Sequence, residues 1–339
     1  MKEAKTPSFA AQFGLAAPVV CGAMYPCSNP ELVAAVSEAG GMGIVQPISL
    51  TYVHGHEFRA GLRFIRARTQ KPVGVNLVVE QSNPKYLERM RRYLLESLEE
   101  GIRFFITSLG NPKWVVDEVQ RVGGVVYHDV TERKWAQKAL DGGVAGLIAV
   151  NNLAGGHAGA RDPKRLLDEL LPLGLPVLCA GGVGNARQFA DMLSLGYQGV
   201  QLGTRFIASD ECSAHADYKA AIVKAQVDDI VLTERLSGVP VAVIKTPYVE
   251  RLGTRAGPIA RWLLRNPKTK HHMRTLYTLL SVYKLKRGLK RELGKNDYWQ
   301  AGRSVAGIDS VLPVATILRD LTHAWQAQQT QSAGHSHGT

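Results

Sequence analysis

Two glycine-rich turns follow consecutive apolar runs near the middle of the chain. The run LPVLCAGG (175–182) leads into Gly184, and the run QGVQLGT (198–204) ends in Gly203 and Thr204. Bare backbone N–H groups in such turns can point at an anion, and a threonine hydroxyl adds a further donor. Tight turns alone would also use glycine, but two such turns in succession favour a ligand that carries a phosphate group.

The segment GGHAG (155–159) surrounds one imidazole with small residues, so that a planar ligand can approach it closely. An imidazole can move a proton near neutral pH without extreme tuning of its pKa. His157 is therefore the candidate base. His54, His56 and His128 are the alternatives, and His128 is the nearest rival because it lies near the end of an expected strand.

No metal-binding or hydrolytic pattern accompanies these residues. The four cysteines, Cys21, Cys27, Cys179 and Cys212, lack the spacing of a metal site. We expect them to be structural rather than redox-active, since Cys in an apolar run usually behaves as a small buried hydrophobe. No Ser-His-Asp arrangement is readable. The pattern favours an organic cofactor that brings its own chemistry, and no metal.

The elements that must position these residues follow one repeating pattern. Short apolar runs bounded by Gly or Pro alternate with longer segments of helical periodicity. Each run is rich in Val, Ile or Leu, as strands buried on both faces require. The eight runs span residues 18–24, 41–46, 72–79, 103–109, 124–130, 145–150, 175–182 and 198–204.

The segments between the runs carry helix start and stop signals. Residues 29–40, 83–101 and 111–124 begin with Asn-Pro and end in Gly, and residues 185–196 begin with Asn and end in Gly. Eight such units predict an α/β fold whose parallel sheet closes into a (β/α)8 TIM barrel, with a doubly wound open sheet as the alternative. In a barrel, the active site lies where the strands end.

The pattern changes after the eighth unit. Residues 211–304 are predicted to form a mostly helical, basic cap, inserted into the barrel and covering its mouth, with one apolar stretch at 239–249. The barrel spans residues 8–210 and is completed by a helix within 305–327. The polar tail 328–339 is expected to be disordered.

The positive charge of the chain is concentrated in the expected cap. The 339 residues include 41 Lys and Arg and 29 Asp and Glu, a net charge of +12, and residues 251–300 hold 13 of the basic and 2 of the acidic residues. The barrel is thus close to neutral, which argues against a nucleic-acid partner. The basic segment 251–295 indicates an anionic substrate or carrier. A membrane-binding or nucleic-acid-binding helix at 273–293 is the alternative.

The expected location of the protein in the cell follows from its composition and from the lack of a signal peptide and of a membrane-spanning run. A content of 45% hydrophobic residues excludes a disordered chain. The sequence has neither the apolar core of a signal peptide nor a run of about 18 apolar residues. We therefore expect a soluble, cytoplasmic protein with no membrane span.

Six motifs together resemble the nitronate monooxygenase family, also called the 2-nitropropane dioxygenases. The resemblance covers about residues 8–325, and YWQAGRSVAGI (298–308) is similar to a late motif of the family. The family consists of FMN-dependent (β/α)8 barrels and includes the flavin-type enoyl-acyl-carrier-protein reductases and related NADH:quinone reductases. The six motifs are PVVCGAM, ELVAAVSEAGGMGIV, PVGVNL, AGGHAG, PVLCAGGVGNARQ and GVQLGTRF.

The resemblance implies where an FMN would bind. Gly22, Ala23 and Met24 would pack against the flavin ring, and Asn76 would hydrogen-bond its polar edge. Gly155 would approach the cofactor closely.

The same resemblance implies a base and a set of phosphate-binding residues. His157 would lie over the flavin ring as the base. The ribityl chain and the phosphate would be held by Gly181, Gly182, Gln201, Leu202, Gly203 and Thr204.

The family's chemistry implies an FMN-dependent oxidoreductase that converts alkyl nitronates or nitroalkanes, with O2, into a carbonyl compound and nitrite. His157 would take the acidic proton next to the nitro group, or the bound nitronate would arrive already formed. The alternative is an NAD(P)H-dependent flavin reductase that acts on an enoyl thioester or a quinone. The basic segment 251–295 supports it, because acyl carrier proteins and coenzyme A are anionic. A homodimer is a further expectation.

Three stretches depart from the family pattern. Residues 21–24 replace the usual QAPM or QGGM, and Val150, Asn151 and Asn152 stand where Gln and Glu are common. Ala158 follows the histidine where Arg or Pro is usual. These changes touch the substrate side more than the phosphate side, so the resemblance predicts the flavin better than it predicts the substrate.

Overall fold

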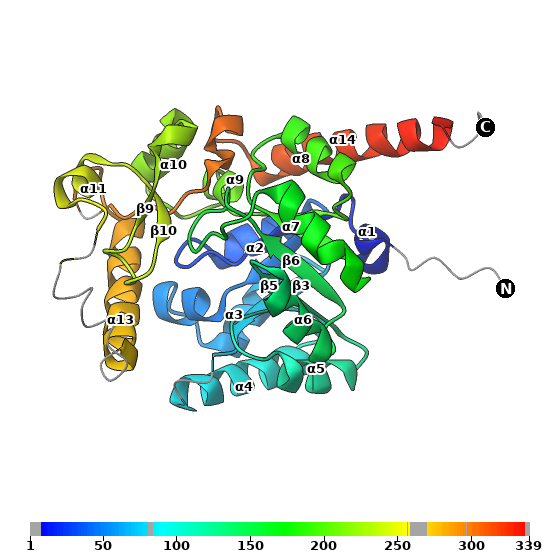
Figure 1. Cartoon of the computed structure of the whole chain (residues 1–339). Coiled ribbons are helices and arrows are strands. Elements are labelled where there is room, and N and C mark those ends of the chain that lie inside the picture. The colour runs from blue at the N-terminus through cyan, green and yellow to red at the C-terminus, as the bar shows by residue number, and fades with distance from the viewer. Residues whose placement is uncertain (1–7, 81–83, 256, 258–269, 296, 336–339) are drawn as a thin grey trace.

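Eight parallel strands form one closed barrel in the computed structural model, which describes residues 8–80, 84–255, 257, 270–295 and 297–335 (Figure 1). The strands pair in chain order, and β8 closes the barrel by pairing with β1. This confirms the predicted TIM barrel and excludes the open sheet. The strands are β1 (Val19–Cys21), β2 (Met42–Val45), β3 (Val73–Val78), β4 (Phe104–Ser108), β5 (Val125–Val130), β6 (Gly146–Val150), β7 (Val177–Ala180) and β8 (Val200–Leu202).

Helices surround the barrel and alternate with its strands, as βα units require. Asn185 caps α8, because its side-chain oxygen accepts a hydrogen bond from Gln188 N at 2.9 Å. Asn29, at the start of α2, does not cap its helix, since its Oδ1 accepts instead from Ser213 N at 3.1 Å. The helices of the barrel are α1 (Phe9–Phe13), α2 (Pro30–Glu38), α3 (Phe58–Arg66), α4 (Pro84–Glu99), α5 (Lys113–Gln120), α6 (Arg133–Asp141), α7 (Pro163–Leu170), α8 (Ala186–Leu195), α9 (Thr204–Ile207) and α14 (Val314–His335), with the shorter turns η1 (Ser49–Val53) and η2 (Leu171–Leu173).

The interior of the barrel is apolar and is closed at one end by α1. Successive residues of a strand face opposite sides, so Phe104, Ile106 and Tyr127 point inward while Phe105 packs against the helices. Phe9 of α1 enters from below, and its ring centroid lies 5.6 Å from those of Phe104 and Tyr127. Figure 1 shows α1 on the side of the barrel opposite to the inserted segment. The open end of the barrel therefore faces the insertion.

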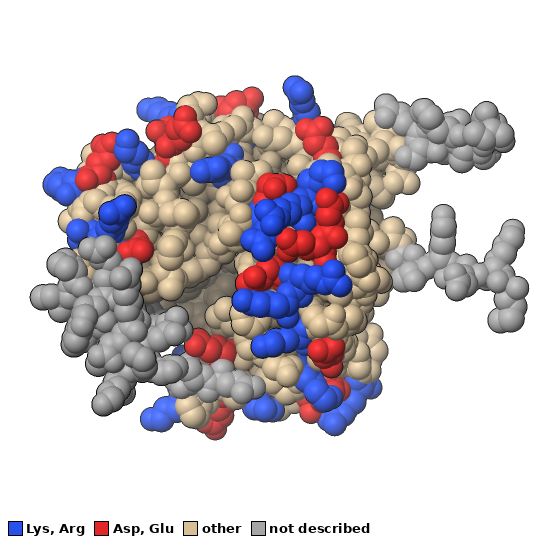
Figure 2. Space-filling model, viewed as in Figure 1, with Lys and Arg blue, Asp and Glu red and all other residues tan. Residues whose placement is uncertain are grey.

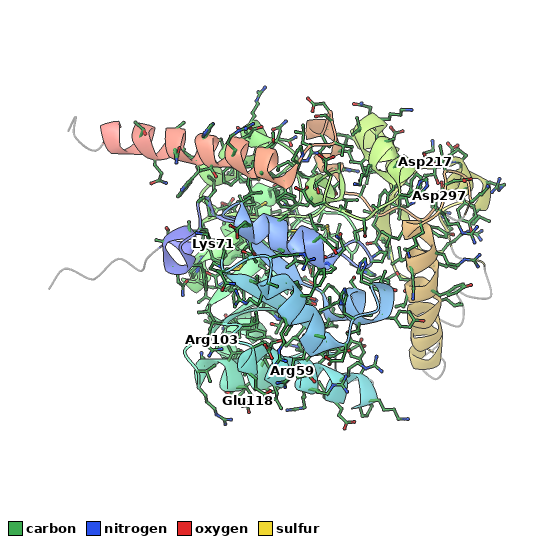
Figure 3. All side chains as sticks on the ribbon, turned by 180° about the vertical axis from the view of Figure 1, so that it is seen from behind. Arg59, Lys71, Arg103, Glu118, Asp217 and Asp297 are labelled. Carbon is green, nitrogen blue, oxygen red and sulfur yellow. The ribbon has the colours of Figure 1, made fainter. Side chains whose placement is uncertain are left out.

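The insertion, residues 211–304, contains a hairpin as well as helices. The apolar stretch at 239–249 supplies β10, which pairs antiparallel with β9 and turns Val241 and Val243 toward Leu285. Figure 3 shows the insertion from behind, with Asp217 and Asp297 labelled in it. Its elements are α10 (Ala216–Lys224), η3 (Val227–Asp229), β9 (Ile230–Thr233), β10 (Val241–Ile244), α11 (Pro247–Leu252) and α13 (Lys270–Leu289), and η4 (Arg303–Gly307) leads back to the barrel.

Two hydrogen bonds attach α13 to loops at the open end of the barrel. Tyr25 Oη, after β1, donates to the carbonyl oxygen of Val282 at 2.9 Å. Lys286 Nζ donates to the carbonyl oxygen of Tyr52, after β2, at 2.6 Å. The insertion is thus attached beside the mouth. Whether it covers the mouth, as the sequence predicts, remains a prediction, because part of the basic segment at 256 and 258–269 lies outside the described residues.

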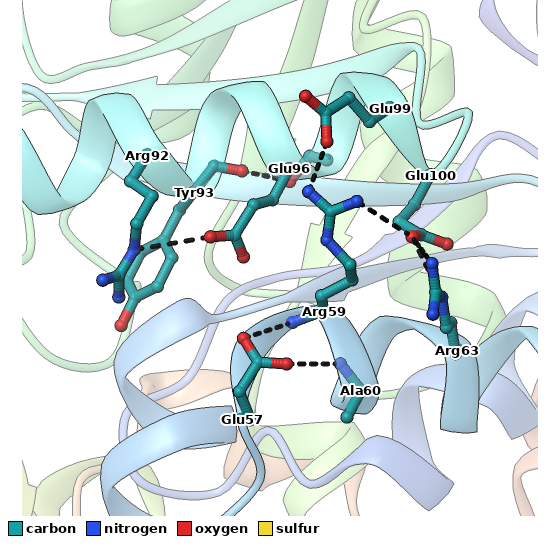
Figure 4. Close-up of polar contacts among 10 residues, drawn as sticks. Glu57, Arg59, Ala60, Arg63, Arg92, Tyr93, Glu96, Glu99 and Glu100 are labelled. Carbon is teal, nitrogen blue, oxygen red and sulfur yellow. Dashed lines mark hydrogen bonds and ion pairs between the residues drawn. The ribbon is translucent and has the colours of Figure 1, made fainter.

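Ion pairs fasten α3 to α4 on the outer surface of the barrel (Figure 4). Arg59 pairs with Glu99 and Glu100, and Arg63 Nη2 lies 2.8 Å from Glu100 Oε1. Glu57 caps α3 by accepting from the backbone N–H of its first turn. Exposed pairs of this kind contribute little stability each. These ion pairs therefore join α3 to α4 on the outside of the barrel, away from its open end.

The C-terminal helix is longer than the sequence analysis predicts. α14 runs to His335, so the expectation of a disordered tail is wrong for residues 328–335, where Gln and Ala favour a helix. Residues 336–339 lie outside the described part. Among the described residues, no helix is both long and apolar enough to cross a membrane.

Candidate active site

The open end of the barrel forms a hollow lined by the last inward-facing residues of the strands. Ile106, Tyr127 and Ile148 in the layer below are all buried. One step further toward the strand ends, the inward residues Val78, Ser108, Asp129, Val150 and Gln201 are only half-buried. Figure 2 shows a hollow in the surface between the barrel and the insertion. The strand ends therefore lie at a hollow of the surface, and its role as the site stays a prediction.

The turn after β7 presents glycine backbone to this hollow. Gly181 and Gly182 are half-buried and have φ of 117° and 87°, a region that residues with a Cβ rarely adopt. A Cβ on Gly181 would also lie 2.4 Å from Asn151 Oδ1. Asn151 donates to the carbonyl oxygen of Gly181 at 3.0 Å and accepts from Leu153 N at 2.8 Å. This side chain, which the sequence analysis did not include in the site, thus ties the loops after β6 and β7 together.

The turns after β1 and β8 meet on the adjacent part of the rim, because β8 pairs with both β7 and β1. A Cβ on Gly203 would lie 3.5 Å from Met24 Sδ, and Ala23 beside it is half-buried. Thr204 is buried, and its hydroxyl oxygen accepts a hydrogen bond from Gly302 N at 2.9 Å. This bond fixes the segment after the insertion and leaves the Thr204 O–H available as a donor, so the phosphate contact by Thr204 stays a prediction.

The side chains of Gln201 and Leu202, the two β8 residues that the resemblance names, face opposite sides of the barrel wall. The Gln201 side chain faces into the barrel and crosses Gly22, where a Cβ would lie 2.8 Å from Gln201 Cγ. The Leu202 side chain faces the helices, and its carbonyl oxygen accepts from Gly22 N at 2.9 Å. Alternation along a strand puts neighbours on opposite sides. Gln201 thus belongs to the floor of the hollow, and the Leu202 side chain does not line it.

Asn76 lies inside the barrel at the expected place. It faces inward from β3, is 7% exposed, and its Nδ2 donates to the carbonyl oxygen of Ile106 at 3.4 Å. This long bond to the neighbouring strand leaves the amide directed along the wall of the hollow.

The glycine at 155 is required by the protein backbone itself. A Cβ there would lie 2.8 Å from Gly302 N and 2.9 Å from the carbonyl carbon of Ala301. Two backbones therefore cross at this point, which explains Gly155 without a bound cofactor. The next residue, Gly156, pairs with Ala242 of β10, and Ala242 N donates to its carbonyl oxygen at 2.8 Å.

His157 stands on this loop between the barrel and the hairpin. Its ring is exposed, and Nε2 lies 3.3 Å from the hydroxyl oxygen of Ser237. The protein around the loop nevertheless removes part of the hydration that a charged ring would need, which lowers the pKa of His157. The imidazole is therefore neutral at pH 7 and able to accept a proton.

The nearest rival, His128, is excluded from the hollow. It faces outward from β5, is buried, and its Nδ1 lies 2.8 Å from the hydroxyl of Thr107 on β4. Burial lowers the pKa of His128 to about 4, so it stays neutral as a core residue. His54 lies on the loop after β2 with Nε2 3.3 Å from the carbonyl oxygen of Pro26.

Asp129 is a second residue that the sequence analysis missed. It follows His128 on β5 and therefore faces inward, toward the hollow. Burial raises the pKa of Asp129 to about 7, and a hydrogen bond from Gln201 opposes this in part. An acidic residue near the end of a buried strand was the available signal, but the sequence does not reveal which of two neighbouring polar residues faces inward.

The cysteines lie outside the hollow. All four are buried thiols, and Cys21 and Cys179 face the helices. In the described part of the chain, no three His, Cys, Asp or Glu side chains gather in a cluster that could hold a metal ion.

Comparisons with known proteins agree with this architecture. The profile of the family described as nitronate monooxygenase matches residues 7–324. The (3aS,4S,5R,7aS)-5-hydroxy-7a-methyl-1-oxo-octahydro-1H-indene-4-carboxyl-CoA dehydrogenase of Mycobacterium tuberculosis is 31% identical over 260 residues, which are 75% of this chain and 70% of that protein. The nitronate monooxygenase of Pseudomonas aeruginosa is 30% identical over 278 residues, 69% of this chain and 78% of that protein.

Among solved structures, FabK from Thermotoga maritima superimposes with a TM-score of 0.78 at 26% identity, covering 98% of this chain and all of that one. The family match spans nearly the whole barrel and the insertion, and it includes every residue of the hollow described above. The chain therefore belongs to the nitronate monooxygenase family, and it is an oxidoreductase of that family.

Proposed function

We propose that this chain is an FMN-dependent oxidoreductase whose flavin binds in the hollow at the barrel mouth. Membership of the family implies a flavin, and the hollow fits one in two respects. Gly181 and Gly182 bring side-chain-free backbone to its edge. Gln201 Oε1 and Asp129 Oδ1, on its floor, lack a hydrogen-bond partner among the described residues. A ligand rich in donors and acceptors would satisfy such a surface.

Each group of residues in the hollow would have its own role in binding FMN and in the reaction. The turns at Gly181–Gly182 and Gly203–Thr204 would hold the phosphate, while Gly22 to Met24 and Asn76 would contact the ring. When bound, FMN supplies the capacity to accept and pass on electrons. The chain itself supplies the proton chemistry at the imidazole of His157.

The observation that carries this proposal is a neutral imidazole beside a glycine-lined hollow. A neutral His157 can take a proton from a carbon whose acidity is raised by an adjacent electron-withdrawing group. A nitro group and a thioester carbonyl both have that effect. The geometry therefore supports one reaction class, proton transfer at the carbon next to the electron-withdrawing group coupled to electron transfer. The imidazole would take the proton from a nitroalkane, and its protonated form would give a proton to the α-carbon when an enoyl thioester is reduced.

A thioester is the first candidate substrate. The M. tuberculosis relative acts on a carboxyl-CoA compound, and relatives of known structure include enoyl-acyl-carrier-protein reductases. The basic segment 251–295 would suit the phosphates of coenzyme A or an acidic carrier protein. NADH or NADPH would then be the electron donor.

A nitronate is the second candidate, and the P. aeruginosa relative favours it. In that reaction O2 takes up the electrons, and the products are a carbonyl compound and nitrite.

One pair of assays distinguishes the candidates. Purified protein loaded with FMN is reduced anaerobically with NADH or NADPH and mixed with crotonyl-CoA, and in parallel it is supplied with propionate 3-nitronate in an oxygen electrode. Flavin reoxidation by crotonyl-CoA supports the thioester, and O2 uptake with nitrite release supports the nitronate. Loaded protein that does neither contradicts both substrate assignments.

A further inference from the structure

The floor of the hollow carries an acidic residue that no part of the proposed reaction uses so far. Asp129 faces inward from β5, directly above the apolar layer formed by Tyr127 and Ile148. Gln201 reaches toward it from β8 across Gly22, and this side chain lowers the pKa of Asp129 in part, against the larger effect of burial. Asp129 Oδ1 and Gln201 Oε1 are both shielded from water, and neither has a partner within the described residues. Two unpaired oxygens thus lie together beneath the place where a ligand would bind.

The surroundings of this carboxyl group disfavour its charged form. Asn76 from β3, Ser108 from β4 and Gln201 from β8 face the same hollow and are uncharged. Tyr127 lies below, and burial raises its pKa further, so it stays a phenol. His157, on the loop after β6, is neutral at pH 7. Desolvation is the main cause of the raised pKa of Asp129, and no charged neighbour in the described structure offsets it.

A protonated carboxyl group has one O–H donor, which can donate either to the unpaired Gln201 Oε1 or to an acceptor on a ligand in the hollow. A buried donor without an acceptor is costly, and so is a buried carboxylate without a countercharge. An acceptor atom on a ligand in the hollow would remove either cost.

We propose that Asp129 is a ligand-binding residue of this site, which donates a hydrogen bond as a carboxylic acid to the flavin in the hollow, with Gln201 as the positioning residue that orients it. The inference rests on the proposed function, because it takes FMN as the ligand. It adds a proton-bearing group to the site, on the barrel floor, in addition to His157 on the loop.

A coupling between FMN binding and one proton follows. If the complex holds Asp129 protonated, FMN affinity must fall once the pH exceeds the pKa of Asp129 in the free protein, up to tenfold for each further pH unit. Between pH 7 and 9 the phosphate of FMN, with a pKa near 6, is already fully ionised. His157 is neutral throughout this range. The pH window therefore isolates Asp129.

The experiment measures the dissociation constant of FMN by fluorescence quenching, at several pH values from 7 to 9, with flavin-free protein. We expect the constant of the natural protein to rise roughly tenfold to fiftyfold. Asp129→Asn keeps the shape and stays neutral, so its constant should change less than about twofold. Asp117→Asn, the same change at an exposed ion pair on α5, is the matched control and should follow the natural protein.

Three outcomes would overturn the inference. The natural protein could bind FMN with no pH dependence, or Asp129→Asn could retain the full dependence, and either leaves the proposed function standing. Failure of the folded natural protein to bind FMN at any pH would refute both. If Asp129→Asn does not fold, Asp129→Ser provides a neutral donor for the same comparison and must also abolish the dependence.

Discussion

His157 and His128 differ in the direction of their side chains, and this difference indicates a chemical role for His157 and a structural role for His128. His157 is exposed beside the hollow, whereas His128 is buried behind the barrel wall against Thr107. Replacing His157 with Asn should leave FMN bound and lower kcat with nitroethane, whose α-proton must be removed, by about 10² to 10⁴, because the site loses its proton acceptor. The visible spectrum and kcat, measured on the same preparation, check both parts.

The matched control is the same substitution at His128. It should leave kcat within about twofold and lower the free energy of unfolding by about 1–3 kcal/mol, since a buried hydrogen bond is disturbed. Loss of turnover at His128→Asn together with normal turnover at His157→Asn would reverse the assignment.

The raised pKa of Asp129 also predicts a pH-dependent stability. The folded protein holds this proton up to about pH 7, whereas the unfolded chain releases it near 3.8. The contribution of Asp129 is therefore full below about pH 4 and is lost as the pH rises toward and through 7. Asp129→Asn should thus stabilise flavin-free protein at pH 8, by at most about 4 kcal/mol, and by much less at pH 5. Urea unfolding at both pH values measures this difference, and an equal effect at the two would count against the raised pKa.

At the scale of elements, the crossing of two backbones at Gly155 joins the loop after β6 to the segment after the insertion. In Gly155→Ala the new Cβ would meet Gly302 N at 2.8 Å, and backbone cannot move aside as a side chain can. We expect a loss of about 1–3 kcal/mol of stability and weaker FMN binding, because the His157 loop shifts. Gly257→Ala, where nothing lies within 4 Å, is the control and should be nearly neutral. Thermal unfolding of both variants tests this, and equal stability would show that the crossing is loose.

The sequence predicts the positions of the barrel strands well. It does not predict which of their side chains point into the barrel and which point toward the helices. Strands buried on both faces appear as continuous apolar runs, so β1 to β8 are recognisable from their length and their Gly or Pro borders. The same burial removes the alternation that would tell inside from outside. The sequence therefore makes His128 a rival site residue and gives no reason to choose Asp129, although of the two only Asp129 faces the hollow.

The insertion shows a second limit. The stretch 239–249 is apolar, yet its partner β9 is short and includes the exposed Leu232, so the pairing is not evident from the sequence. The contact of β10 with Gly156 joins segments far apart in the chain and carries no local signal. The same holds for the link between His157 and Ser237. Such contacts depend on tertiary packing, which local periodicity does not record.

At the scale of the whole molecule, a nearly neutral barrel is joined to a basic insertion. If the insertion attracts an anionic thioester, KM for crotonyl-CoA should rise severalfold between about 50 and 300 mM salt, because screening weakens long-range attraction. The uncharged N-acetylcysteamine thioester of crotonate is the control and should show an unchanged KM. Equal salt dependence for the two thioesters would remove the insertion from substrate recognition.

The central claim is that the hollow at the barrel mouth binds one FMN. Titration of FMN into folded, flavin-free protein tests this most directly, with fluorescence quenching and the visible spectrum recorded together. The account predicts saturable binding of one FMN per chain, weakened at least tenfold by Gly181→Val, whose side chain would meet Asn151 and Ala154. Absence of binding, or binding that is unaffected by that substitution, would contradict it.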